Sequence, residues 1–121
     1  TAHGSGYGEY YDRWYEVSQK GIREVLSFPA EIYEGGFGHL PERDLDSRFL
    51  SHTVEADGAD VINVKFTDTL RAPSLGKRGR ILSRSIVTVA YVKKPNAFVF
   101  SFDPKRSSVS RKKLNKLFTG R

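Results

Sequence analysis

Cysteine and methionine are both absent from the chain of 121 residues. Without thiols the protein has no disulfide scaffold, thiolate zinc site, iron–sulfur site or cysteine nucleophile, so any catalysis would use other side chains. A chain without cysteine suits the cytosol, the periplasm, an organelle or the exterior, which leaves the compartment open. Because Met is missing and the first residue is Thr1, we expect a processed mature chain or a domain excised from a longer polypeptide.

Long apolar runs are also missing from the sequence. The longest candidate, residues 86–92, contains Thr88, whereas a helix that crosses a bilayer needs about 20 consecutive apolar residues. We therefore predict that the chain has no transmembrane segment.

Sequence motifs for nucleotides and metals are lacking as well. The glycines of residues 35–38 are not followed by the Lys-Ser or Lys-Thr of a phosphate loop. Glu42, Asp44 and Asp46 alternate in an acidic loop that lacks the glycine and the distal glutamate of an EF-hand. The sequence therefore predicts no cofactor and no metal site.

The composition is that of a folded protein. Hydrophobic residues make up 38% of the chain and aromatic residues 12%, which is enough to bury a modest core. The length is that of one ordinary domain. We predict that residues 1–121 form a single domain, in which the Gly-rich residues 1–8 form a mobile N-terminal segment.

The first regular element is predicted to be a helix over residues 9–27. Apolar and aromatic residues recur there at spacings of three and four, which is the period of an amphipathic helix. The residues that share this face are Tyr11, Trp14, Ser18, Ile22 and Val25. Gly21 weakens the pattern, and Pro29 ends it because proline breaks the hydrogen bonding of a helix interior.

Alternating apolar and polar residues predict strands further along the chain. We expect a short strand at residues 30–34 and a hairpin of residues 50–56 and 62–66 around the Asp57-Gly58 turn signal. Residues 81–92 carry apolar groups in both alternating sets of positions, which is typical of a central strand, and Ser83, Arg84 and Ser85 indicate that its first half is partly exposed.

Two further segments complete the sheet region. Residues 68–80 contain Pro73, two glycines and several cations without any period, which predicts a long basic loop. Residues 97–102 are predicted to return as a strand that has its phenylalanines on one face. We interpret these phenylalanines as core residues rather than as a stacking platform for unpaired bases.

The chain is predicted to end in a helix. Ser107 or Ser108 caps it, Gly120 closes it, and one face is apolar, with Val109, Leu114, Leu117 and Phe118. Together these elements predict an α+β fold: an antiparallel sheet of about four or five strands, covered on one face by an N-terminal and a C-terminal helix.

Charge is distributed very unevenly along the chain. Residues 1–70 contain six Lys or Arg and thirteen Asp or Glu, which gives a net charge of −7. Residues 71–121 contain fourteen Lys or Arg and one Asp, which gives a net charge of +13. We expect either a strong dipole or partial neutralisation of one half by the other. A basic segment of this kind favours a polyanionic partner.

The candidate binding residues are the cations of the second half. If they converge in the fold, they can neutralise several phosphates at once. They are Arg71, Lys77, Arg78, Arg80, Lys93, Lys94, Lys105, Arg106, Arg111, Lys112, Lys113 and Lys116. The first hypothesis is a non-enzymatic basic binding module or adaptor that engages RNA or another polyanionic surface through these residues, while its acidic N-terminal half contacts a protein partner.

Two alternatives stay open. One is a small metal-independent endoribonuclease or toxin-like domain, in which His39 and Glu42 exchange protons with the substrate and cations stabilise the phosphorane. His52 alternates with Leu50 and Val54 in a predicted strand, so we interpret it as a satisfied, partly buried side chain. The other alternative is an accessory subunit that docks its basic surface on a large protein complex.

Overall fold

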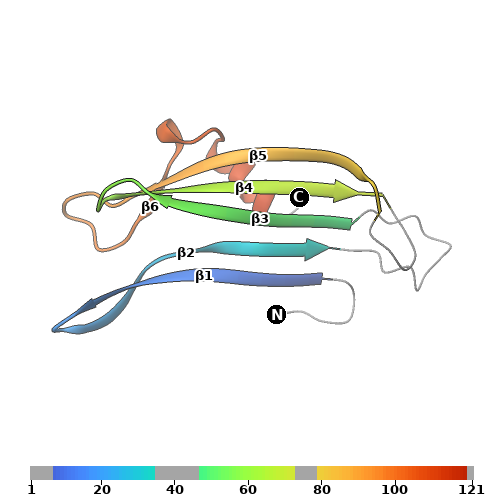
Figure 1. Cartoon of the computed structure of the whole chain (residues 1–121). Coiled ribbons are helices and arrows are strands. Elements are labelled where there is room, and N and C mark those ends of the chain that lie inside the picture. The colour runs from blue at the N-terminus through green and yellow to red at the C-terminus, as the bar shows by residue number, and fades with distance from the viewer. Residues whose placement is uncertain (1–6, 35–46, 73–78, 120–121) are drawn as a thin grey trace.

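The described part of the chain forms a six-stranded antiparallel sheet with one short α-helix against it, as a computed structural model shows (Figure 1). The structure describes residues 7–34, 47–72 and 79–119. Its elements are β1 (Tyr7–Ser18), β2 (Gly21–Glu34), β3 (Ser47–Ala56), β4 (Val61–Arg71), β5 (Ile81–Val92), β6 (Ser101–Asp103), the 3-10 helix η1 (Pro104–Arg106) and α1 (Arg111–Thr119). Each strand pairs with the next along the chain, so the sheet order is β1 to β6.

The predicted N-terminal helix is wrong, and so is the predicted sheet covered by two helices. Residues 9–27 belong to the β1–β2 hairpin, whose chain reversal ends at Gly21 with a φ of +125°. That backbone conformation suits glycine and interrupts a helix. The residues expected on one face of a helix lie on different faces of the hairpin. Trp14 packs against the core, whereas Tyr11 and Ile22 are 50% and 71% exposed.

Two β-bulges shape β2. Tyr10 pairs with Glu31 and Tyr11 with Pro29, which leaves Ala30 between two pairs. Trp14 pairs with Leu26 and Tyr15 with Glu24, which leaves Val25 as a second residue of β2 without a partner in the β1–β2 ladder. A bulge leaves a residue outside the ladder and bends its strand. Pro29 is tolerated in this strand because a bulge is a place where a missing N–H does not break the pairing.

The bulged strand β2 separates from β3 and closes over the core. β2 pairs with β3 only over Ile32–Glu34, whereas it pairs with β1 along its whole length. Beyond this contact β1 and β2 curve away from β3 to β5, as the left side of Figure 1 shows. The carbonyl of Val25 then accepts a hydrogen bond of 2.8 Å from the backbone N–H of Phe100, so the segment after β5 joins β2.

The second hairpin confirms the sequence analysis. β3 and β4 pair through ten residue pairs around the turn that contains Gly58, whose φ is +77°. The strand predicted at residues 81–92 is β5 with the same bounds. β5 is not a central strand, however, because its second neighbour β6 pairs with it only over Ala90–Val92. The strand predicted at residues 97–102 is wrong over residues 97–100, because β6 begins only at Ser101.

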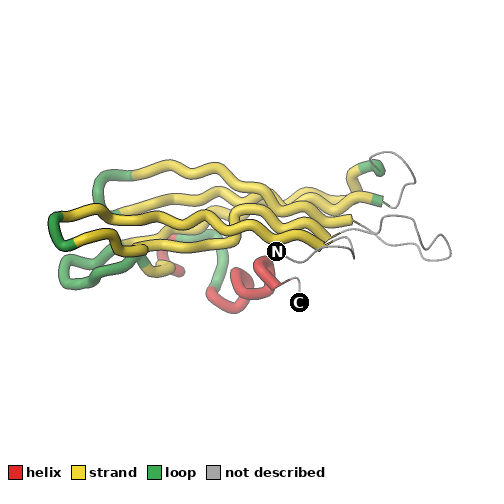
Figure 2. The backbone as a smooth tube through the Cα atoms, turned by 90° about the horizontal axis from the view of Figure 1, so that it is seen from below, coloured by secondary structure: helices red, strands yellow, loops and turns green. Residues whose placement is uncertain are grey.

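The core lies between the sheet and α1. Phe66 is fully buried, and its ring meets those of Phe28 and Phe118 edge to face, at centroid distances of 5.9 Å and 5.2 Å. Leu114 of α1 is buried in the same cluster. Figure 2 shows α1 on one side of the strands, which leaves the other side of the sheet uncovered by any described helix. Burial raises the pKa of Tyr91 to about 12, so its phenol stays neutral near pH 7.

The side chain of Arg48 fixes the end of α1. Its Nε donates to Asp68 Oδ1 over 2.7 Å, and a second guanidinium nitrogen donates to the carbonyl of Leu117 in the last turn of the helix. The side chain of Arg48 is only 12% exposed. A cation at this end opposes the negative pole of the helix dipole, so the pair Arg48 and Asp68 links β3, β4 and α1.

Two phenylalanine truncations test this arrangement. Phe66→Ala should lower the free energy of unfolding by about 3–5 kcal/mol, because it opens a cavity at the centre of the core. Phe98 is 67% exposed, so Phe98→Ala should cost under about 1 kcal/mol. Urea unfolding of both variants measures the difference. Equal losses would contradict a core centred on Phe66.

Candidate functional site

The predicted cationic residues do not form one patch. Arg71 and Arg80 lie where β4 ends and β5 begins, and Lys93 and Lys94 follow the opposite end of β5. A strand as long as β5 spans about 35 Å, so these two groups are far apart. The third group comes from η1 and α1. Lys77, Arg78, His39 and Glu42 lie outside the described residues.

Arg71 helps to close its own end of the sheet. Its guanidinium donates to the carbonyl of Gly79 over 2.9 Å, and the backbone N–H of Ala72 donates to the carbonyl of Arg80 over the same distance. Arg71 therefore holds the two strands together at this end. Its hydrogen-bonding capacity is partly used within the fold.

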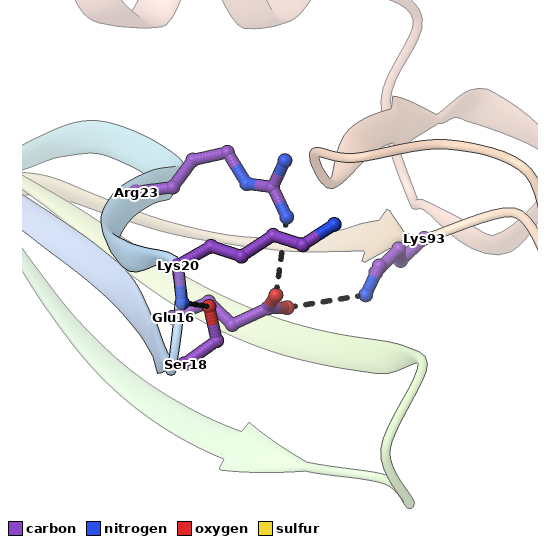
Figure 3. Close-up of polar contacts among 5 residues, drawn as sticks. All are labelled: Glu16, Ser18, Lys20, Arg23 and Lys93. Atoms are coloured by element: carbon purple, nitrogen blue, oxygen red, sulfur yellow. Dashed lines mark hydrogen bonds and ion pairs between the residues drawn. The ribbon is translucent and has the colours of Figure 1, made fainter.

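Lys93 is engaged with the acidic half of the chain. Its Nζ lies 3.4 Å from Glu16 Oε2, and Arg23 donates to Glu16 Oε1 over 3.2 Å (Figure 3). Figure 3 shows the carboxylate between the two cations, next to the β1–β2 turn. Hydrogen bonds from Arg23 and Lys93 hold the pKa of Glu16 below its ordinary value. Lys93 thus contributes to the closure of the fold.

The exposed side of α1 carries the densest group of cations. Leu114 is buried and Leu117 and Phe118 pack against the core, which turns the polar side of the helix to solvent. The exposed cations on it are Arg111, Lys112, Lys113 and Lys116. Ser110, not Ser107 or Ser108, caps the helix: its Oγ accepts from the N–H of Lys113 over 3.3 Å.

The cations of η1 continue this group. The guanidinium of Arg111 lies 5.3 Å from the centre of the Phe102 ring, which places the start of α1 next to β6 and η1. η1 adds Lys105 and Arg106. We call the residues Lys105, Arg106, Arg111, Lys112, Lys113 and Lys116 the C-terminal cationic surface. Its one acidic neighbour in the described part of segment 93–119 is Asp103, which is 3.7 Å from Arg106.

Ion pairing leaves the two halves of the chain largely separate. Among the described residues, the pairs Arg13–Glu24, Arg23–Glu16 and Arg48–Asp68 lie within the acidic half, and Arg106–Asp103 lies within the basic half. Only Lys93–Glu16 connects the two. The acidic half therefore does not neutralise the C-terminal cationic surface through direct ion pairs in the part of the chain that the structure shows.

His52 has a structural role, as its strand pattern predicted. Its ring is 17% exposed and packs edge to face on Phe28. Nδ1 lies 2.9 Å from the carbonyl oxygen of Ala30, and Nε2 lies 3.2 Å from Asp12 Oδ2. Both partners are acceptors, so an imidazolium serves both and a neutral ring serves one. His52 therefore links β1, β2 and β3, and both of its ring nitrogens face acceptor atoms of the protein.

The phenylalanines of the last strand region divide between core and solvent. Phe100 and Phe102 pack against the core, in agreement with the sequence analysis. Phe98 is exposed instead, and the guanidinium of Arg23 lies 4.7 Å from the centre of its ring. The sequence had no signal for this split, because the strand that would align the three rings begins only at Ser101.

The exposed first half of β5 contains a cation that the sequence analysis did not select. Residues 81–86 are all exposed, and they include Arg84, which was not among the candidate binding residues. Their polar side chains predicted partial exposure, whereas their apolar side chains suggested burial on both faces. Within the described ranges, no group of three or more His, Asp or Glu side chains is arranged to hold a metal ion. The described segments likewise include no helix with the length and apolar character to cross a membrane.

The pKa of Glu16 makes a prediction about stability. A carboxylate whose pKa is lowered in the folded state stabilises the fold above its ordinary pKa of 4.5, and this stabilisation is lost as pH falls through the lowered value. Glu16→Gln should therefore be less stable than the parent at neutral pH, and the two should converge in acid. Urea midpoints measured across this pH range test it. The control Glu55→Gln, at an exposed site, should show little difference, and a pH-independent loss in Glu16→Gln would contradict the assignment.

Comparison with known proteins adds no relative to these observations. No protein-family model matches the chain, and neither the search of curated proteins nor the search of solved structures found a match.

Proposed function

We propose that the protein is a non-enzymatic binding module that engages a polyanion, with RNA as the first candidate, through its C-terminal cationic surface. The observation that carries this proposal is the concentration of six cations on η1 and α1 with one neighbouring carboxylate in segment 93–119. Phosphate groups are the ligands that such a surface neutralises best, since each contact releases condensed counterions.

The local electrostatics of α1 support a bound anion. The first turn contains Arg111, Lys112 and Lys113 and no acidic residue. These cations lie at the positive pole of the helix dipole, where negative charge is favoured and positive charge is not. Lys112 and Lys116 are also four residues apart, so their like charges repel each other. A polyanion along this side of the helix relieves both repulsions.

The core contacts of α1 make the surface rigid. Leu114 is buried, and Arg48 holds the carbonyl of Leu117. The cations therefore extend from a fixed backbone, so fewer degrees of freedom are lost on binding than for a disordered basic tail. This rigidity favours a module that presents its charges to one face of an elongated partner.

RNA binding should depend steeply on salt and on α1. We expect labelled single-stranded RNA to be retained at low salt and released as salt rises, and the RNA to stay intact. Lys112→Glu with Lys116→Glu should weaken binding at least about tenfold and reduce the salt slope by about 1.4, because two phosphate contacts are lost. Filter binding across a salt series measures both.

A matched variant controls for net charge. Lys20→Glu with Lys65→Glu changes the total charge equally but alters exposed residues of the β1–β2 turn and β4 rather than of η1 and α1. This control should keep most of the affinity. Equal losses in the two double variants would refute a surface centred on α1, and cleavage of the RNA would direct attention to His39 and Glu42.

A further inference from the structure

The outer edge of β5 is divided into a covered and a free part. The carbonyl of Thr88 accepts from the N–H of Ser108 over 2.8 Å, and the N–H of Thr88 donates to Ser108 Oγ over 2.9 Å. The N–H of Ala90 donates to Ser107 Oγ over 2.9 Å, and β6 pairs with residues 90–92. Among the described residues, nothing pairs with this edge of β5 from Ile81 to Val87.

The contacts of Thr88 establish which backbone groups point outward. Residues two apart in a strand direct their N–H and C=O groups to the same side. Since these groups of Thr88 point away from β4, those of Ile86 and Arg84 do so as well, while those of Ser85 point toward β4. β5 therefore offers donors and acceptors at Arg84 and Ile86 in the geometry of an unfinished sheet.

The side chains along the free edge are apolar and cationic. Ile81, Leu82 and Ile86 are exposed large apolar residues, at 43%, 42% and 56%. Arg84 lies beside them, and Arg80 directly precedes the strand. No Asp or Glu occurs between Asp68 and Asp103 in the sequence. The edge thus combines open backbone hydrogen bonding with a single sign of charge.

We propose that the free edge of β5 binds an extended segment of a partner protein, which adds as a further strand and alternates carboxylates with apolar side chains along the one face that meets Arg84 and Ile86. The backbone groups at Arg84 and Ile86 hydrogen-bond to the added strand, as in other cases of strand addition. A carboxylate across from Arg84 and an apolar residue across from Ile86 match the outer side of the sheet. This interface is separate from the C-terminal cationic surface.

Charge makes a second copy of the chain a poor occupant. Two β5 edges in contact bring Arg80 and Arg84 of one chain near those of the other, and like charges across paired strands are destabilising. Charged residues on exposed edges are a common device against such self-pairing. The same cations attract an acidic strand, so the edge discriminates by charge.

Two blocked synthetic peptides of eight residues provide the probe: a valine–glutamate peptide that repeats Glu-Thr-Val-Thr, so that Glu and Val alternate along one face, and a valine–lysine peptide that repeats Lys-Thr-Val-Thr. Fluorescence anisotropy at physiological ionic strength should show saturable binding of the valine–glutamate peptide alone. Ile86→Pro removes an outward N–H without touching the bonds to β4, and should weaken binding at least about tenfold. Ile86→Ala keeps that N–H, and should lose less than about threefold.

A charge reversal keeps the test decisive if Ile86→Pro disturbs the fold. Arg84→Glu should lose the valine–glutamate peptide and gain the valine–lysine peptide. Three results would overturn the proposal. The first is no saturable binding, and the second is equal binding of the valine–glutamate peptide by the parent and by both β5 variants. The third is loss of binding only in the Lys112→Glu, Lys116→Glu double variant. A dimer of the chain alone that Ile86→Pro converts to a monomer would also overturn it.

Discussion

The structure depends on the separation of β2 from β3. If β2 paired with both of its neighbours along its whole length, the sheet would stay flat and open. The apolar side chains on one face of the sheet would then need a second layer of structure to cover them. Here the bulges at Val25 and Ala30 release two backbone carbonyls from the β1–β2 ladder. One accepts from the N–H of Phe100 and the other lies against the ring of His52. Both interactions direct β2 across the core, so the sheet covers much of its own interior.

This closure also determines where the cations are displayed. The chain that leaves β5 passes Val25 and returns to the β5 edge through Ser107 and Ser108. Only then does it form α1, whose apolar residues complete the core. The placement of η1 and α1 therefore follows from backbone hydrogen bonds and from the burial of Leu114. Their cations are left outside because neither interaction involves them, which is why so few are paired within the described fold.

The parts of the fold that the sequence predicted well are those with one dominant pattern. The β3–β4 hairpin has strict alternation and a glycine turn, and α1 has an apolar stripe that strand spacing does not explain. The prediction for the β1–β2 hairpin was wrong because its residues fit both the helical period of 3.6 and the strand period of 2. Only the long-range contacts of Trp14 and Leu26 decide between the two structures. For the site, the helix pattern predicted the exposure of Arg111, Lys112 and Lys116. The sequence did not predict that the other cations are dispersed, because their positions depend on strand lengths and strand pairing.

The exposed half of β5 shows why an apolar strand is not always a buried one. Its composition resembles that of a central strand, yet the described segment that follows β5 covers the edge only from Thr88 onward before it forms α1. The remaining edge differs physically from the C-terminal cationic surface. Affinity there would come mainly from backbone hydrogen bonds and apolar contact, which salt screens little, while Arg84 supplies the selectivity for a carboxylate. Phosphate binding at α1, by contrast, falls steeply with salt. The two proposed binding surfaces are therefore suited to different classes of partner.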